Sequence, residues 1–355
     1  MTDGVDFQVN RSALRESRRV VADTDLADGQ VLLRVTKFAL TANNVTYAAI
    51  GEQFGYWKFF PAEAPWGRVP VWGFADVAES RCPGIDAGER IWGYYPMASH
   101  LVVTPARVTT HGFVDGAAHR AGLPPVYNQY ERTAADPGYR EAEENVLALF
   151  RPLFITGFLL DDFIDESGGF GARRIALSSA SSKTALSLAN LLKSRGTFEV
   201  VALTSRANAD FVGRTGYYDR VVAYDELDAL PTEPSLALID MAGDAGLIDR
   251  LADRLGDSFV YNGMVGGAHW DAPAGAAKGP PRTLFFAPDR IVKRRKDWGP
   301  DGFAARYGAA WSRFMGSAAG WLSIVEEQGP EALEARWRML LDGKARPEEG
   351  FILGL

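Results

Sequence analysis

Between residues 174 and 261 the sequence alternates short apolar runs with helical segments, and this alternation constrains the fold more than any other feature. We expect strands at 174–177, 198–203, 220–223, 236–240 and 259–261, with helices at 185–193, 207–213 and 245–255. Strands that alternate with helices form βαβ units, whose parallel sheet is covered by helices on both faces. The second half therefore predicts a doubly wound α/β domain.

Residues 5 to about 110 follow a different pattern, in which short β-rich runs are separated by glycine, proline and aspartate turns. The runs lie at 30–35, 69–78, 90–94 and 100–103, with one helical stretch near 44–50. This pattern predicts a compact, mostly antiparallel β domain. A chain of 355 residues exceeds the size at which one core usually stops growing, so two domains are expected.

The stretches between and after these domains carry weaker signals. Residues 141–150 and 156–164 have helical patterns, and the apolar run 146–160 is interrupted by Arg151 and Pro152. The proline- and glycine-rich stretches 265–281 and 297–302 predict mobile loops.

Composition limits the partners that this chain can have. The net charge is −7, which argues against a nucleic-acid backbone or an anionic membrane as the main partner. The single cysteine, Cys82, excludes an intrachain disulfide and a cysteine-rich zinc site. The acidic start and the short, interrupted apolar run lack the pattern of a signal peptide or a membrane span, so we expect a cytoplasmic protein.

The segment after the strand at 174–177 is the strongest candidate for chemistry. A strand that enters a turn of small residues and then a helix is the phosphate-binding element of nucleotide folds. Here small residues (Ala180, Ser182 and Ala185) stand where a G-x-G-x-x-G loop has glycines. The hydroxyls of Ser181, Ser182 and Thr184 and the Lys183 ammonium could hold a pyrophosphate, although serine-rich helix starts are also common N-caps.

The end of the next strand indicates which dinucleotide such a loop would hold. An NAD site places Asp or Glu there to bind the ribose 2′-hydroxyl. Here Thr204, Ser205 and Arg206 follow 24 to 26 residues after Ala180, without a carboxylate. Arginine beside hydroxyls suits the 2′-phosphate of NADP(H), whereas the alternative is a solvated arginine at a helix start.

Several motifs resemble those of the medium-chain dehydrogenase/reductase superfamily, in its zinc-free, quinone-oxidoreductase-like branch. The chain also resembles an uncharacterised bacterial subgroup of that superfamily, a domain of unknown function. The segments that carry the resemblance are 29–35, 40–44, 71–77, 83–93, 240–243, 261–263 and 343–347. Of these, the 83–93 turn is the most specific, because it is similar to an F-x-x-G-D-R-V-x-G motif.

The resemblance implies a GroES-like β domain (residues 1–125 and 318–355) and a Rossmann NADP-binding domain (126–317), with substrate and cofactor in the cleft between them. It places Asn44, Tyr224, Met241, Asn262 and Gly263 beside the cofactor. Asn44 has a competing interpretation as the cap of the short helix.

Two departures from the superfamily pattern stand out. One cysteine and four scattered histidines (His100, His111, His119 and His269) leave no ligand set for catalytic zinc. The stretch 112–144 is longer than the superfamily's usual linker, and it is either a lid or specificity loop or a plain surface excursion.

Without zinc, reduction of an activated alkene or quinone needs a donor at the developing enolate. Tyr47 and Tyr56 are the candidates, because a tyrosine hydroxyl stays protonated at neutral pH. In the competing interpretation, these tyrosines and the surrounding aromatic residues simply form a core or the wall of a pocket. His269 is a further candidate for contact with substrate.

These features predict an NADPH-dependent, zinc-independent oxidoreductase of an enone, an enoyl thioester or a quinone, acting on a small apolar or aromatic substrate. The alternative is a non-catalytic NADP(H)-binding sensor or scaffold with the same fold. A homodimer through a sheet edge at 284–286 is possible. The basic run 293–296 could bind an acidic substrate tail, but a solvated face is favoured.

Overall fold

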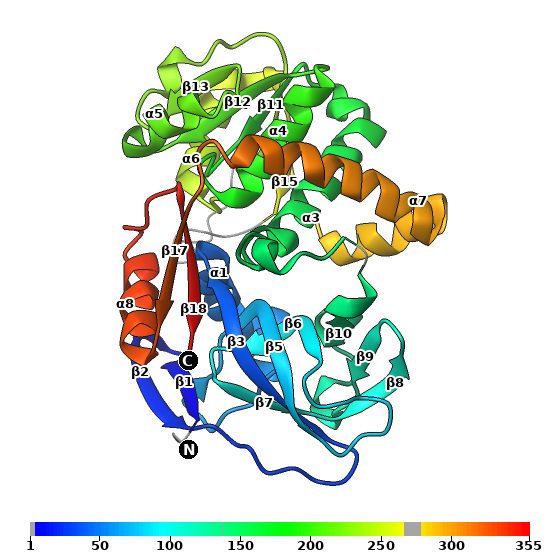
Figure 1. Ribbon diagram of the computed structural model, residues 1–355. Helices are drawn as coiled ribbons and strands as arrows, with labels where there is room; N and C mark the ends of the chain where they lie inside the picture. Colours follow the sequence, from blue (N-terminus) through cyan, green and yellow to red (C-terminus); the bar gives the residue numbers. More distant parts are fainter. Residues whose placement is uncertain (1–3, 137, 266–277) are drawn as a thin grey trace. The chain divides into compact units, whose positions relative to one another are not determined.

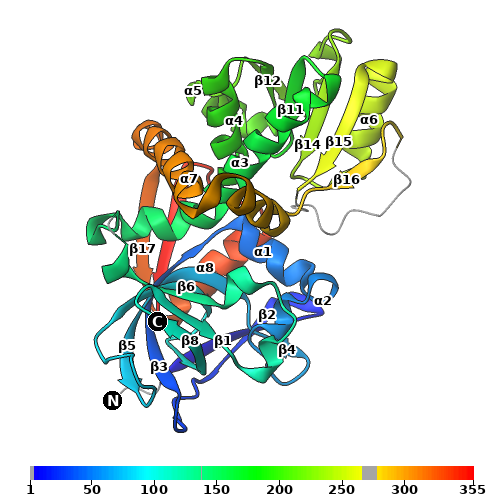
Figure 2. The same cartoon turned by 90° about the vertical axis from the view of Figure 1, so that its right-hand side faces the viewer.

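The computed structural model describes residues 4–136, 138–265 and 278–355, and the chain divides into two compact units (Figures 1 and 2). Unit 1 comprises Met1–Arg151 and Ser323–Leu355, and unit 2 comprises Pro152–Leu322. The expected division at 125/126 falls inside unit 1. Residues beyond it supply a strand, β10 (Gln129–Arg132), that pairs with β6 (Arg90–Pro96) of the same unit.

Unit 1 is built mainly from antiparallel strands, as the sequence predicts. Its larger sheet has nine strands in the order β17-β18-β3-β5-β6-β10-β9-β8, with β7 paired to β3. The bounds of the others are β3 (Val31–Leu40), β5 (Pro70–Ser80), β7 (His100–Val103), β8 (Pro105–Thr109), β9 (Gly112–Asp115), β17 (Ser323–Gln328) and β18 (Glu349–Gly354). The smaller sheet has the order β2-β1-β4, with β1 (Val5–Asn10), β2 (Ala13–Val21) and β4 (Trp66–Gly67).

Three complete α-helices, the first turns of a fourth and several short 3₁₀ turns complete the described part of unit 1. The helices are α1 (Ala42–Ala49), α2 (Gly51–Phe54) and α8 (Pro330–Leu341). Helix α8 fixes the C-terminal segment to the sheet, because Trp337 is fully buried and donates from Nε1 to the Leu14 carbonyl at 2.8 Å. The 3₁₀ turns that matter below are η1 (Tyr56–Lys58), η2 (Ala118–Arg120) and η3 (Pro125–Asn128).

Unit 2 contains the expected doubly wound domain. All neighbouring strands of its six-stranded sheet are parallel, in the order β13-β12-β11-β14-β15-β16. The strands are β11 (Arg174–Leu177), β12 (Glu199–Thr204), β13 (Arg220–Ala223), β14 (Leu236–Asp240), β15 (Phe259–Met264) and β16 (Arg282–Leu284). Helices α4 (Lys183–Arg195), α5 (Arg206–Arg214) and α6 (Ala245–Leu255) alternate with them. The edge strand β16 lies where an edge was expected, and Leu284 is half-exposed.

Two long helices correct the sequence interpretation. The helices expected at 141–150 and 156–164 form one helix, α3 (Glu144–Glu166), which continues through Pro152. Phe150 and Phe154 on either side of this proline are fully buried, and their burial outweighs the hydrogen bond that proline cannot donate. The stretch 297–302, expected to be a loop, lies inside α7 (Ala287–Ala318), whose kink at Gly299 (φ 72°) uses a backbone conformation that favours glycine.

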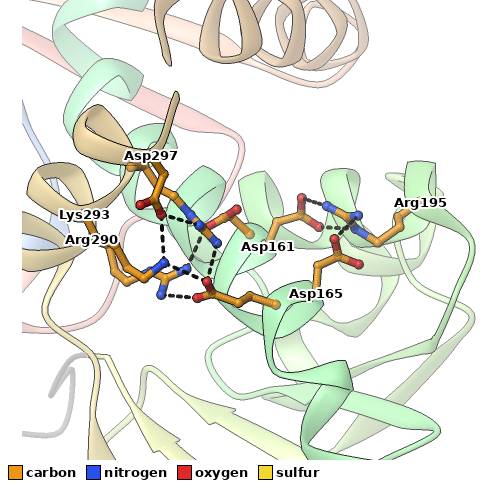
Figure 3. Close-up of polar contacts among 9 residues, drawn as sticks. Asp161, Asp165, Arg195, Arg290, Lys293 and Asp297 are labelled. Carbon is orange, nitrogen blue, oxygen red and sulfur yellow. Dashed lines mark hydrogen bonds and ion pairs between the residues drawn. The ribbon is translucent and has the colours of Figure 1, made fainter. Parts of the chain in front are cut away.

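Helix α7 packs against the end of α3 through ion pairs (Figure 3). Asp162 accepts from Arg290 Nη2 at 2.6 Å and from Arg294 Nε at 2.5 Å, and Glu166 accepts from Lys293 Nζ at 2.7 Å. The expectation of a solvated face at 293–296 is therefore wrong for Arg294, which is buried and paired. These ion pairs neutralise Lys293 and Arg294 of the basic run 293–296 within the chain.

This ion-pair network predicts acid sensitivity. Hydrogen bonds from Lys293, and then from Arg290, lower the pKa of Glu166 to about 2. A carboxylate whose folded pKa is depressed stabilises the fold above its unfolded pKa of about 4.3, and loses that effect as pH falls toward the folded value. We expect Glu166→Gln to lower the urea midpoint at neutral pH and the difference to vanish toward about pH 2. A difference that is constant across this range would contradict the assignment.

Candidate functional site

The carboxyl end of β11 lies at the point where the direction of chain progression in the sheet reverses. From β11 the chain moves outward to β12 and β13, and then returns to β14 on the other side of β11. In open parallel sheets, ligands bind at such a switch point, beyond the carboxyl ends of the strands. The segment 178–183, the phosphate-loop candidate, starts there and leads into α4.

Ser178 fixes the start of this loop. Its side chain is fully buried, and Oγ donates to Asp240 Oδ1 at 2.6 Å. The same oxygen accepts from the backbone N–H groups of Met241 (2.8 Å) and Ala242 (3.0 Å). The ends of β11 and β14 are thereby joined, and this role of Ser178 was not predicted from the sequence.

Two tyrosines and an asparagine brace the rest of the loop. Ser179 has φ +46°, a left-handed conformation that is unusual for a residue other than glycine, and its N–H donates to the Tyr224 hydroxyl at 2.7 Å. The Tyr218 hydroxyl donates to the Ala180 carbonyl at 2.7 Å, and Asn208 Nδ2 donates to Ser181 Oγ at 3.0 Å. Tyr224 is thus brought to the loop, as expected, while Asn208 and Tyr218 were missed.

The loop ends at the N-terminus of α4. Ser182 is its N-cap, with Oγ accepting from the Ala185 N–H at 3.3 Å, so the cap interpretation is correct. Ala180 and Ala185 are fully buried, which explains why only small residues fit there. The first turn, which begins with Lys183 and Thr184, carries no acidic residue, and the helix dipole favours an anion at this end.

Two carboxylates from a later segment lie at the end of β12, although the sequence at that strand end contains none. Thr204 is buried and its carbonyl accepts from the Tyr224 N–H at 2.8 Å, while Ser205 starts α5 without a side-chain cap bond. Arg206 pairs with Asp225 at 2.9 Å and with Glu226 at 2.8 Å. The hydrogen bonds that Arg206 donates to these carboxylates raise the pKa of its guanidinium. A 2′-phosphate would have to compete with them for the guanidinium.

The ends of β14 and β15 bring the remaining expected cofactor residues together. Met241 is buried directly after β14, and Asn262 and Gly263 lie on β15 in register with Leu238 and Ile239. Asn262 is fully buried, yet its amide oxygen and its amide nitrogen have no hydrogen-bond partner in the part of the chain that the structure describes. A Cβ at Gly263 would lie 2.8 Å from a ring carbon of Tyr261, so this position requires glycine.

In unit 1, Asn44 has a structural role. Its Oδ1 accepts from the Thr41 N–H at 2.7 Å, and its Nδ2 donates to the Pro70 carbonyl at 2.8 Å, so it caps α1 and ties it to β5. The two ends of its amide are therefore engaged. The cap interpretation of Asn44 is therefore confirmed, and its contact with a cofactor stays a prediction.

Tyr47 and Tyr56 lie in a compact group of aromatic side chains. We call this group the aromatic cluster, and its members are Tyr47, Tyr56, Phe59, Phe60, Trp72, Tyr94 and Tyr127. The ring centroids of Tyr47 and Tyr56 are 4.5 Å apart, and those of Tyr94 and Tyr127 are 4.8 Å apart. Burial raises the pKa values of Tyr47 and Tyr56 above the ordinary tyrosine value, so both stay protonated donors at neutral pH.

Tyr94 and Trp72 were not singled out from the sequence. The Tyr94 hydroxyl and the Trp72 indole nitrogen are buried and lack a hydrogen-bond partner. Alternation along β5 and β6 could have identified them, because cross-strand neighbours Trp72 and Tyr94 project from the same face. His269 lies outside the described residues.

Within the described residues, no helix has the length and apolar character needed to cross a membrane, and no cluster of histidine, cysteine, aspartate and glutamate has the arrangement of a metal site.

Solved structures share this architecture of an antiparallel β unit and a doubly wound unit. CurA from Vibrio vulnificus is similar over 99% of this chain and 98% of its own, at 12% identity and TM-score 0.62. A putative NADPH:quinone reductase from Bacillus thuringiensis is similar over 100% of both chains, at 12% identity and TM-score 0.58. The yhdH oxidoreductase from Salmonella enterica, in complex with NADP, is similar over 96% and 97%, at 14% identity and TM-score 0.51.

These likenesses confirm the predicted fold class, a GroES-like β unit and a Rossmann unit. The chain belongs to the family described as "Protein of unknown function (DUF2855)", which matches residues 38–346. This confirms the resemblance to a domain of unknown function. No curated protein matches the sequence.

Proposed function

We propose that this protein is an NADPH-dependent oxidoreductase that reduces an activated alkene or a quinone without zinc. The observation that carries the proposal is the loop 178–183, which lies at the switch point of the sheet and leads into the N-terminus of α4. Similarity to solved structures whose titles name NADPH or NADP supports the choice of cofactor.

The residues of unit 2 fit a dinucleotide in three places. Small buried side chains at Ala180 and Ala185 allow a pyrophosphate to approach the backbone, and Lys183 adds a positive charge at the helix start. Arg206 can bind an adenosine 2′-phosphate when the phosphate displaces Asp225 and Glu226 from its guanidinium. The orphaned amide of Asn262 offers a donor and an acceptor, which is what a nicotinamide carboxamide requires.

When bound, the cofactor supplies the hydride. The chain supplies hydrogen-bond donors for the substrate oxygen, on which negative charge develops during the transfer. Tyr47 and Tyr56 are proposed for this role, because burial keeps both hydroxyls protonated. A tyrosine that remains protonated can donate a hydrogen bond at any pH where the protein is active.

Isothermal titration of the full chain with NADPH, followed by a panel of enones, enoyl thioesters and quinones, tests the proposal. We expect binding, and oxidation of NADPH with at least one acceptor. Binding without turnover, and without an effect of Tyr47→Phe or Tyr56→Phe, would favour the alternative of a non-catalytic NADP(H)-binding sensor. The unusual serine-rich loop is the feature that favours this alternative. Absence of heat with both NADP⁺ and NADPH would refute both.

Arg206 gives a prediction about cofactor preference. We expect Arg206→Ala to weaken NADPH binding several-fold and to leave NADH binding almost unchanged, because only NADPH carries a 2′-phosphate. Conversely, Asp225→Asn with Glu226→Gln should strengthen NADPH binding, since it removes both competing carboxylates. Titration of each variant with both cofactors checks this. Equal losses for NADPH and NADH in Arg206→Ala would contradict the assignment.

A dimer through the edge strand β16 remains part of the proposal. Sedimentation of the full chain measures the oligomeric state directly.

A further inference from the structure

The segment 116–128, which follows β9, forms an arch that is anchored inside unit 1. Arg120 in η2 forms an ion pair with Asp115 at 2.9 Å, and both side chains are at most 3% exposed. Directly after the arch, β10 joins the sheet between β6 and β9. The Tyr130 hydroxyl on β10 donates to the Tyr94 carbonyl at 2.8 Å. Of the two expectations for the 112–144 stretch, a plain surface excursion therefore does not describe the arch.

Tyr127, a residue of the arch, packs in the aromatic cluster. The Tyr127 ring centroid lies 4.8 Å from that of Tyr94, 5.2 Å from that of Phe59 and 6.0 Å from that of Tyr56. Its hydroxyl interacts with those of Tyr47 and Tyr56. The arch thus adds a third hydroxyl to the two that the sequence singled out.

The cluster also contains buried polar groups that have no hydrogen-bond partner among the described residues. Tyr94 is fully buried and its hydroxyl has no hydrogen-bond partner, and the same holds for the buried indole nitrogen of Trp72. The Trp72 and Tyr94 ring centroids are 4.9 Å apart, so the two donors belong to one neighbourhood. A buried donor without a partner destabilises the folded chain, and such groups call for an explanation.

A ligand with a flat apolar face and one carbonyl oxygen would satisfy these groups. Aromatic rings offer edges and faces for stacking, and the unpaired donors offer hydrogen bonds to an oxygen. Tyr56, Trp72 and Tyr127 are only partly buried, so the cluster reaches the surface. A flexible aliphatic carbonyl compound would accept the same hydrogen bonds but would gain little from stacking on the aromatic rings.

We propose that the aromatic cluster of unit 1 binds flat aromatic carbonyl compounds, and that Tyr127, carried by the arch 116–128, is the specificity-determining residue. The inference deepens the proposed function, because it narrows the substrate class of the same enzyme. It assigns hydrogen bonds to the carbonyl oxygen from the Tyr127 hydroxyl and from the unpartnered donors of Tyr94 and Trp72.

Ligand-observed NMR titration of the full chain with 1-indanone and with indane tests the proposal, because the two probes differ only in the carbonyl oxygen. We expect the wild-type chain to bind 1-indanone about 10-fold more tightly than indane, as one to two net hydrogen bonds provide. Tyr127→Phe should reduce this preference about threefold, and Trp72→Phe should also reduce it. Tyr127→Ala should weaken both probes, since it removes the ring.

Tyr139→Phe is the matched control, because its hydroxyl donates to Glu144 outside the cluster. This variant should keep the full preference for 1-indanone. Equal affinity for the two probes in the wild-type chain, or an unchanged preference in Tyr127→Phe, would overturn the inference. NADPH titration of the same samples separates the two proposals: a Tyr127-dependent preference without NADPH binding would sustain this inference and refute the proposed function, whereas NADPH binding without that preference would do the reverse.

Discussion

Ser182→Asp is expected to abolish binding of NADPH while leaving α4 as stable as in the wild-type chain. Aspartate is as good an N-cap as serine, and its charge suits the positive end of the helix dipole. The same charge would face the pyrophosphate that the loop 178–183 is proposed to hold. Two like charges about 4 Å apart repel by several kcal/mol at the effective dielectric of a protein surface, so we expect a loss of at least about 100-fold in affinity.

Calorimetric titration with NADPH, combined with thermal unfolding of the same samples, checks this separation of stability from binding. Ser182→Asn is the control, because asparagine is as good an N-cap as aspartate but carries no charge. That variant should be as stable as Ser182→Asp and should bind NADPH far more tightly than it does. If Ser182→Asp bound NADPH as the wild-type chain does, Ser182 would be an N-cap and nothing more, and the proposed cofactor site would be wrong.

The regular strands of unit 2 could be predicted closely because local and global signals agree there. Strands β11, β13 and β14 and helix α6 have the bounds expected from the sequence. Each strand is a short, mostly apolar run between turn signals, and its apolar residues pack in the sheet, so the pattern and the packing favour the same structure. Agreement of this kind does not depend on contacts between distant segments.

The full extent of the helices α3 and α7 could not be predicted, because distant contacts override the local signals at their prolines. Pro152 and Pro300 favour a break, and the prediction followed them. In the structure, Phe154 of α3 stacks on Phe314 of α7 with ring centroids 5.2 Å apart, and Asp162 pairs with Arg290 and Arg294. No short window of sequence contains both partners of such contacts.

The residues of the candidate site likewise divide into those that one motif identifies and those that distant segments contribute. Residues consecutive in the chain, such as Ser181, Ser182 and Lys183, could be identified from one motif. Tyr218 and Asn208, which brace that loop, follow it by at least 25 residues and carry no motif. The acidic partners of Arg206 were missed for the same reason, since Asp225 and Glu226 lie on the segment after the next strand.

Arg120→Met is expected to destabilise unit 1 by about 3–5 kcal/mol, because it leaves the buried carboxylate of Asp115 without its ion-pair partner. It also leaves the Tyr127 carbonyl and the Tyr130 hydroxyl without the donors that Arg120 provides at 3.2 and 3.3 Å. Urea unfolding of the variant measures the loss. The arch that carries Tyr127 should loosen at the same time, so the variant should also lose its preference for 1-indanone over indane.

The double variant Arg120→Met with Asp115→Asn identifies the source of the destabilisation. Asparagine removes the orphaned charge but keeps an oxygen that can accept from the Thr104 and Ala117 N–H groups, as Asp115 does at 3.2 and 3.1 Å. We therefore expect the double variant to be more stable than Arg120→Met by about 1–2 kcal/mol. Arg15→Met, at an exposed ion pair with Asp342, should change stability by at most about 1 kcal/mol. If the double variant were no more stable than Arg120→Met, the unpaired charge would not be the cause, and packing of the arginine side chain against Phe60 would carry the effect instead.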